Sequence, residues 1–147
     1  MAIAGITKLR KTATQNIATG AWRTVTWDVE DYDNLGAVNL GSSSSNIVVP
    51  TGITLMRASL LLNWANNSSS GRYANLTDGT RTYLADLRDS LNESMSSSCS
   101  GWIAITAGTT IYLQVNSGAA TLNLGGTFSY YPELTIEWAT TWASIYS

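Results

Sequence analysis

Short apolar segments that alternate with polar residues run along most of the chain. In residues 22–29, large apolar and polar side chains alternate, so Val25, Trp27 and Val29 are expected on one face of a strand. Residues 53–64 form the longest expected strand, in which Leu60, Leu62 and Trp64 share a face. This period of two residues is typical of strands that bury one side.

Turn signals divide the rest of the chain. Pro-Thr-Gly at 50–52, Asp-Gly at 78–79 and Ala-Gly at 107–108 each favour a reversal of the chain. The further expected strands are residues 47–49, 72–76, 82–87, 102–105, 110–115, 121–124 and 134–138. Many short strands at close turn spacing predict an all-β antiparallel sandwich or barrel, and the jelly roll is one such fold.

Two Ser- and Asn-rich segments are expected loops, residues 66–71 and 90–101. Residues 85–95 leave an alternative open, because Leu84, Leu87, Leu91 and Met95 have helical spacing. Loops on a rigid sheet scaffold often carry recognition. Asn66 and Asn67 are therefore candidate ligand-loop residues, against the alternative of an inert linker.

Composition limits the classes of function. The chain has 147 residues, which suits one domain with a real core. Its charged fraction is 12%, about half the usual share, and its net charge is −2. A broad basic face for nucleic acid is not expected, and a weakly charged surface suits close contact with copies of the same chain.

The chain offers little to nucleophilic catalysis. It contains no histidine, and Cys99 is its one cysteine, so neither an intramolecular disulfide nor a Cys–His pair is expected. No catalytic residue is assigned. The N-terminus has few apolar residues before its basic group, and no apolar run reaches the length of a membrane span, so neither a signal peptide nor a transmembrane segment is expected.

Charge is unevenly distributed near the N-terminus. A basic group comes first and an acidic group follows: Lys8, Arg10 and Lys11, then Asp28, Glu30, Asp31 and Asp33. Both groups are typical of solvated or salt-bridged faces. The functional alternatives are a basic arm that docks on an acidic surface and an oxygen-rich Ca²⁺ site at the acids. Paired carboxylates also occur in glycoside hydrolases, which keeps a third, enzymatic reading open.

Aromatic residues are numerous, with six tryptophans. They are typical of a core or subunit interface, and a sugar-stacking platform is the alternative. Trp138, Trp142 and Tyr146 recur every four residues, which on a strand forms one face and makes them candidates for a subunit interface. Tyr130 and Tyr131 precede Pro132 and are candidates for an exposed aromatic ligand loop.

Three turn sequences in order carry a resemblance to a known family. Trp22, Val25, Trp27 and Asp28 follow an aromatic-x-x-Val-x-aromatic-Asp pattern, residues 48–53 read Val-Val-Pro-Thr-Gly-Ile, and residues 105–113 read Ile-Thr-Ala-Gly-Thr-Thr-Ile-Tyr-Leu. From about Lys8 onward the chain resembles the globular head domain of the C1q family, a jelly roll shared with tumour necrosis factor. Thr109 departs from this pattern, where the family usually has Asp.

The resemblance implies an antiparallel jelly-roll sandwich that assembles as a homotrimer. Stand-alone domains of this kind resemble head-fibre, decoration and tail-tip domains of bacteriophage virions. We therefore expect an attachment arm at residues 1–12, a jelly roll at 13–139 and a tail at 140–147. The expected function is a non-enzymatic structural and adhesion module in a phage particle, bound to capsid or tail protein and to host-surface glycans, without a cofactor. A free carbohydrate-binding lectin module is the alternative.

Overall fold

The computed structural model describes residues 3–64, 71–88, 95–118, 121–125 and 130–143. These residues form fourteen β-strands. The strands are β1 (Gly5–Arg10), β2 (Gln15–Ile17), β3 (Arg23–Thr24), β4 (Val29–Asp33), β5 (Val38–Asn39), β6 (Ser43–Val48), β7 (Leu55–Asn63), β8 (Arg72–Thr77), β9 (Thr82–Arg88), β10 (Met95–Cys99), β11 (Ile103–Ala104), β12 (Thr110–Ser117), β13 (Leu122–Leu124) and β14 (Glu133–Ala139).

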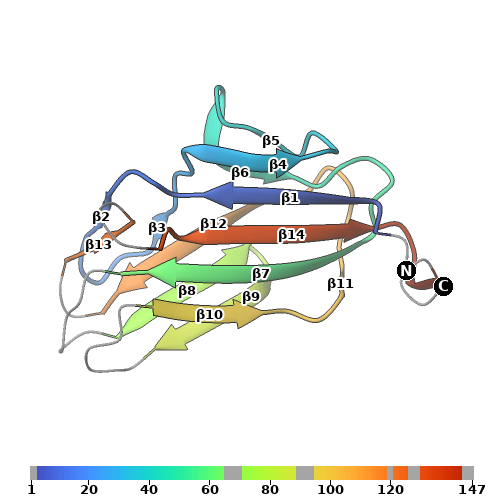
Figure 1. Cartoon of the computed structure of the whole chain (residues 1–147). Coiled ribbons are helices and arrows are strands. Elements are labelled where there is room, and N and C mark those ends of the chain that lie inside the picture. The colour runs from blue at the N-terminus through green and yellow to red at the C-terminus, as the bar shows by residue number, and fades with distance from the viewer. Residues whose placement is uncertain (1–2, 65–70, 89–94, 119–120, 126–129, 144–147) are drawn as a thin grey trace.

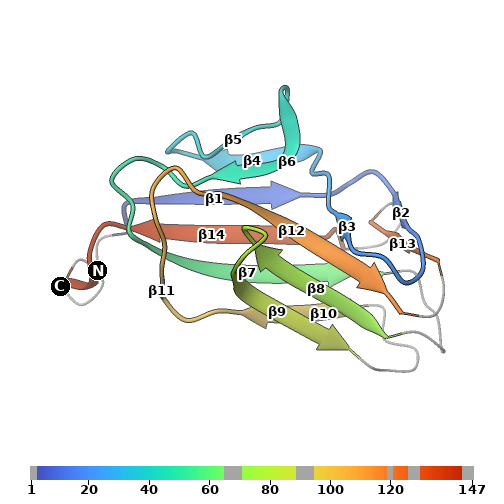
Figure 2. The ribbon, with the colours of Figure 1, turned by 180° about the vertical axis from the view of Figure 1, so that it is seen from behind.

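The strands form two facing layers (Figures 1 and 2). Sheet 1 has the order β10-β7-β14-β1-β4, and β11 also pairs with β7. Sheet 2 has the order β5-β6-β12-β8-β9, and β3 also pairs with β12, while β13 and β2 form a small ladder of their own. All pairings between these strands are antiparallel. The expected antiparallel jelly-roll sandwich is confirmed.

The core lies between the two sheets and consists of alternate residues of the facing strands. On β12 the buried apolar positions are Ile111, Leu113 and Val115, with partly exposed residues between them. Trp27, Trp64 and Trp138 are among the largest fully buried side chains. Removing such apolar area from water stabilises the fold by about 25 cal/mol per Å².

The predicted turns lie where they were expected, and two of them are joined. Gly52, Gly79 and Gly108 all have positive φ angles, of 82°, 90° and 81°, which glycine adopts without strain. Val49 N donates to Thr109 O, and Gly108 N donates to Val49 O, both at 2.9 Å. The two turn sequences that carry most of the family resemblance therefore lie side by side.

Residues 22–29 do not form the single strand that their alternation predicted. β3 pairs with β12 in sheet 2, whereas β4 pairs with β1 in sheet 1, and residues 25–28 cross between the layers. Val25 and Trp27 remain buried in the crossing, as the pattern predicted, because they point into the core between the sheets. We call residues 25–28 the crossover.

The attachment arm expected at residues 1–12 is also wrong where the structure describes it. Residues 5–10 form β1, an interior strand of sheet 1 between β14 and β4. The inward residues of β1 are Gly5, Thr7 and Leu9, a set too polar to produce an apolar alternation in the sequence. A side chain on Gly5 would meet that of Leu35, which explains the glycine. The jelly roll therefore begins at Gly5.

The expected loop at 90–101 is corrected in part, because residues 95–99 form strand β10 along the edge of sheet 1. Residues 82–88 form strand β9, so the helical alternative for residues 85–95 is wrong over residues 85–88. Residues 89–94 lie outside the described part of the chain. Among the described residues, no helix has both the length and the apolar character that crossing a bilayer requires.

Candidate functional site

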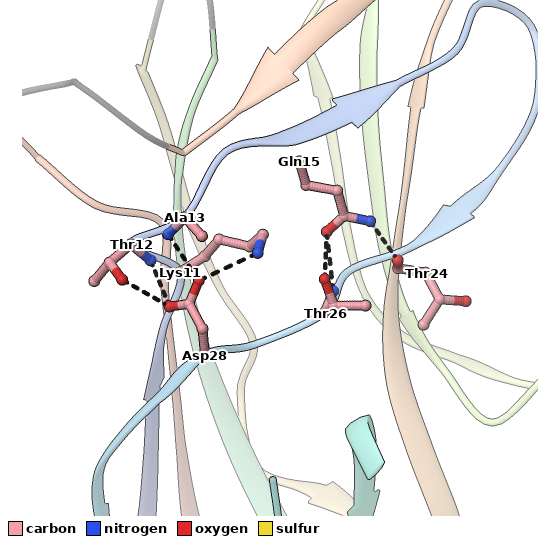
Figure 3. Close-up of polar contacts among 7 residues, drawn as sticks. All are labelled: Lys11, Thr12, Ala13, Gln15, Thr24, Thr26 and Asp28. Carbon is pink, nitrogen blue, oxygen red and sulfur yellow. Dashed lines mark hydrogen bonds and ion pairs between the residues drawn. The ribbon is translucent and has the colours of Figure 1, made fainter. Parts of the chain in front are cut away.

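The most heavily hydrogen-bonded carboxylate described lies at the crossover (Figure 3). Asp28 accepts hydrogen bonds from Thr12 N at 2.6 Å, Ala13 N at 2.7 Å and Thr12 Oγ1 at 3.0 Å. Lys11 Nζ lies 3.3 Å from Asp28 Oδ2, and Lys11 is only 4% exposed. The carboxylate thus ties the chain after β1 to the chain before β4.

The charged form of Asp28 is the form that this environment favours. Burial is the largest single effect on the pKa of Asp28 and raises it, but the hydrogen bonds from Thr12 and Ala13 and the charge of Lys11 together lower it below its usual value. Asp28 is therefore a structural anion whose acceptor capacity is used by protein donors.

Gln15 holds the other half of the same connection (Figure 3). Its Nε2 donates to Thr24 O at 2.8 Å, and its Oε1 accepts from Thr26 N at 3.0 Å and from Thr26 Oγ1 at 3.2 Å. We call Gln15 and Asp28, with their partners, the crossover clamp. The clamp fixes where the chain leaves sheet 2 for sheet 1.

The other acidic candidates do not join Asp28. Arg10 Nε donates to Asp31 Oδ2 at 2.6 Å, and this hydrogen bond is the main cause of the lowered pKa of Asp31. Asp33 accepts from Thr7 Oγ1 and from the backbone of Val38, while Glu30 is exposed. In the described ranges no three His, Cys, Asp or Glu side chains gather as metal ligands would. The proposed Ca²⁺ cluster of residues 28–33 is therefore not assembled.

The basic candidates have partners within the domain. Lys8 Nζ lies 3.0 Å from Glu133 Oε2, and Arg10 and Lys11 pair with Asp31 and Asp28 as described. These charges are balanced within the domain, and the docking role expected of Lys8, Arg10 and Lys11 stays a prediction.

The aromatic candidates separate from one another. Trp138 is fully buried in β14, and its Nε1 donates to Thr7 Oγ1 at 2.8 Å. Trp142 lies beyond the end of β14 and is 50% exposed. The prediction that Trp138 and Trp142 share one strand face is therefore wrong. Tyr146, Asn66 and Asn67 lie outside the described residues. Tyr130 and Tyr131 are exposed, as the aromatic-loop hypothesis expects, and Tyr131 lies under the Arg10 guanidinium.

A shallow hollow marks the outer face of sheet 1, the face that Figure 1 presents to the viewer. Its volume is about 320 Å³. Its centre is a row of small side chains that pair across three strands, Cys99 on β10, Ser59 on β7 and Thr135 on β14. An adjoining hollow of about 300 Å³ shares these three residues and extends to Arg57 and Glu137.

Charge at the edges of the hollow is compensated within the chain. Arg57 forms an ion pair with Glu137, and the guanidinium also lies over the Trp102 ring, 5.3 Å from its centroid. The hydrogen bond from Arg57 to Glu137 raises the pKa of Arg57, which therefore stays charged. A partner could cover this face without isolating a charge. Sequence reasoning missed the hollow because serine-rich β10 was expected to be a loop.

Comparison by sequence finds no matching protein-family model and no matching curated protein. Comparison of structures finds similar folds along nearly the whole chain. PRD1 vertex protein P5 aligns with a TM-score of 0.65 and 9% identity, covering 94% of this chain and 99% of that one.

Two further solved structures show the same fold. The globular domain of zebrafish complement 1qA has a TM-score of 0.56 at 9% identity and covers 93% of this chain and 97% of its own. Murine APRIL has a TM-score of 0.55 at 16% identity and covers 92% and 98%. The chain therefore has the C1q- and TNF-like jelly-roll fold that its turn sequences indicated.

Proposed function

We propose that the chain is a non-enzymatic structural module of a phage particle, assembled as a homotrimer and joined to capsid or tail protein. The observation that carries this proposal is the fold similarity to PRD1 vertex protein P5, which covers almost all of both chains. The similarity to a vertex protein favours a location in a virion.

The disposition of ionisable groups supports a structural role. The carboxylates of Asp28, Asp31, Glu133 and Glu137 all bind cations of the same domain. A general acid or base needs a carboxylate that can reach a substrate and exchange a proton with it. These four carboxylates are instead engaged in ion pairs that hold strands together.

The hollow on sheet 1 is the surface proposed for self-association. Its small central side chains let a neighbouring copy approach the sheet closely, and its flanking ion pairs leave no charge to be desolvated alone. Leu61 and Trp102 add apolar area beside the small residues. Three copies related by a closed rotation would each offer this face to a different surface of the next copy.

Replacing Ser59 with arginine should separate the subunits. The exposed hydroxyl lies at the centre of the hollow, and a long cation there would be buried without a partner. We expect light scattering to show a single chain for Ser59→Arg. Asn46→Arg, at an exposed position of β6 in sheet 2, is the matched control and should keep the wild-type mass.

Circular dichroism should report the same strand content for both variants, since each change is at the surface. An assembled Ser59→Arg protein would refute the assignment of this face. A wild-type protein that is already a single chain would refute the proposed trimer itself.

A carbohydrate-binding module remains the second candidate function. The exposed rings of Trp22, Tyr130 and Tyr131 favour it, because sugars stack on accessible aromatic faces. Glycan contact and trimer assembly are compatible, so the glycan question is tested separately.

A further inference from the structure

The outer face of sheet 2 carries a row of side chains that the trimer proposal does not use. Asn116 on β12 is directly opposite Tyr73 on β8, and Tyr73 is directly opposite Leu87 on β9. Directly paired residues of antiparallel strands point to the same face. Trp22 precedes β3 and extends the row, since its ring meets that of Tyr73 edge-on with centroids 6.4 Å apart.

The two ends of this row, Trp22 and Leu87, are exposed although they are aromatic and apolar, and Tyr73 and Asn116 between them are partly exposed. Trp22 is 42% exposed and Leu87 is 64% exposed. The Tyr73 ring lies against two glycines, because a Cβ on Gly71 would come within 2.6 Å of the Tyr73 hydroxyl and a Cβ on Gly118 within 3.4 Å of the ring. Tyr73 is thus held in place between the glycine backbone and Trp22, as a preformed platform.

A second row beside the platform supplies amides. Gln114 on β12 is opposite Asn75 on β8. These two residues are the next outward-facing pair along the strands after Asn116 and Tyr73. Within the described residues, neither Asn75 nor Gln114 makes a side-chain hydrogen bond. Their donors and acceptors are available to a ligand that lies across the rings.

Asn116 gives an independent sign of a missing partner. Its Oδ1 is buried and has no hydrogen-bond donor among the described residues. A buried acceptor without a donor costs about 1–3 kcal/mol, so such atoms are rare in folded proteins. A ligand hydroxyl would supply the donor once the side chains that cover this oxygen move aside.

We propose that Trp22, Tyr73, Asn75, Gln114 and Asn116 form a binding site for a neutral glycan. An aromatic platform with amides beside it matches the apolar face and the equatorial hydroxyls of a neutral hexose. The two rows contain no carboxylate, guanidinium or ammonium, so nothing in them favours a sialylated or phosphorylated sugar. The site lies at the end of sheet 2 where β8 begins and β12 ends, far from the paired start of β1 and end of β14 (Figure 2).

This inference rests on the proposed function at one point: the proposed function supplies the source of the glycan, which is a surface that the particle meets. The test is a titration of the full chain with cellotriose, maltotriose and tri-N-acetylchitotriose, followed by NMR shifts of the indole N–H signals. Titrating to about 20 mM would saturate a site with a dissociation constant of about 1 mM. We expect at least one of these sugars to bind, and sialyllactose to bind at least tenfold more weakly.

Trp22→Ala and Asn75→Ala should each weaken the binding at least tenfold, while Tyr32→Ala, an exposed aromatic on β4 in sheet 1, should leave it unchanged. Both test residues are solvent-accessible, so the fold should survive. No binding of any neutral trisaccharide, or binding that Trp22→Ala leaves intact, overturns the site. The molar mass of the same samples separates the glycan site from the proposed trimer. A trimer that binds no sugar overturns the glycan site alone.

Discussion

Replacing Trp138 with alanine should lower the free energy of unfolding by about 3–5 kcal/mol, the usual cost of removing a buried large aromatic side chain. The indole is fully buried near the end of β14, the central strand of sheet 1. Its removal leaves a cavity that the flanking strands β1 and β7 cannot fill without shifting out of register.

The indole also begins a chain of hydrogen bonds across three strands. Trp138 Nε1 donates to Thr7 Oγ1 at 2.8 Å, and Thr7 Oγ1 donates to Asp33 Oδ1 at 3.0 Å. This chain links β14 through β1 to the edge strand β4. Trp138→Ala breaks it at its origin and leaves the buried Thr7 hydroxyl without a donor.

Trp138→Phe is the matched control, because it keeps most of the ring and removes the donor. We expect it to cost about 1–2 kcal/mol, near the value of one buried hydrogen bond plus a small loss of volume. Urea unfolding at one fixed protein concentration should give both values, since assembly contributes to apparent stability. Equal losses for the two variants would mean that the cavity adds nothing and that Trp138 is not packed as described.

The second large effect is expected at the crossover clamp. Asp28→Ala should cost about 2–3 kcal/mol, because two backbone N–H groups lose a charged acceptor and the buried Lys11 ammonium loses its counter-ion. Asp31→Asn is the control, since the ion pair of Asp31 with Arg10 is at the surface and should contribute little.

The effect of Asp28 should depend on pH in a defined direction. Its pKa is lowered in the folded protein, so the folded state binds the proton less readily than the unfolded chain. The stabilisation is fully present above the unfolded pKa, about 3.9, and is lost as the pH falls through the lower folded pKa.

The gap in stability between wild type and Asp28→Ala should therefore be constant near neutral pH and narrow below about pH 4. Urea unfolding between acid and neutral pH measures it. A gap that widens on acidification would show that the charged carboxylate does not hold the crossover.

Much of the fold was predictable because its turns and its core alternation are local signals. The Pro-Thr-Gly, Asp-Gly and Ala-Gly turns require glycine at positive φ, and each lies at the predicted position. Leu60, Leu62 and Trp64 are buried on one face of the long central segment, as their spacing indicated.

The errors arose where the inward positions are small or polar. In β1 the inward residues Gly5 and Thr7 are determined by Leu35 and Trp138, which are distant in sequence. β10 is Met-Ser-Ser-Ser-Cys, which has no apolar alternation, and only pairing with β7 makes it a strand. The partners of the basic and acidic groups near the N-terminus were missed for a related reason. Lys11 and Asp28 are 17 residues apart in sequence, and Arg10 and Asp31 are 21 apart, so local patterning cannot show that these opposite charges are partners.

The account depends on three copies covering one another through the hollow face of sheet 1. The most direct measurement is the molar mass of the purified chain, by light scattering over a range of concentrations. The account predicts a mass three times the 15.8 kDa of one chain, constant on dilution to micromolar concentration. A constant mass of 15.8 kDa would contradict it.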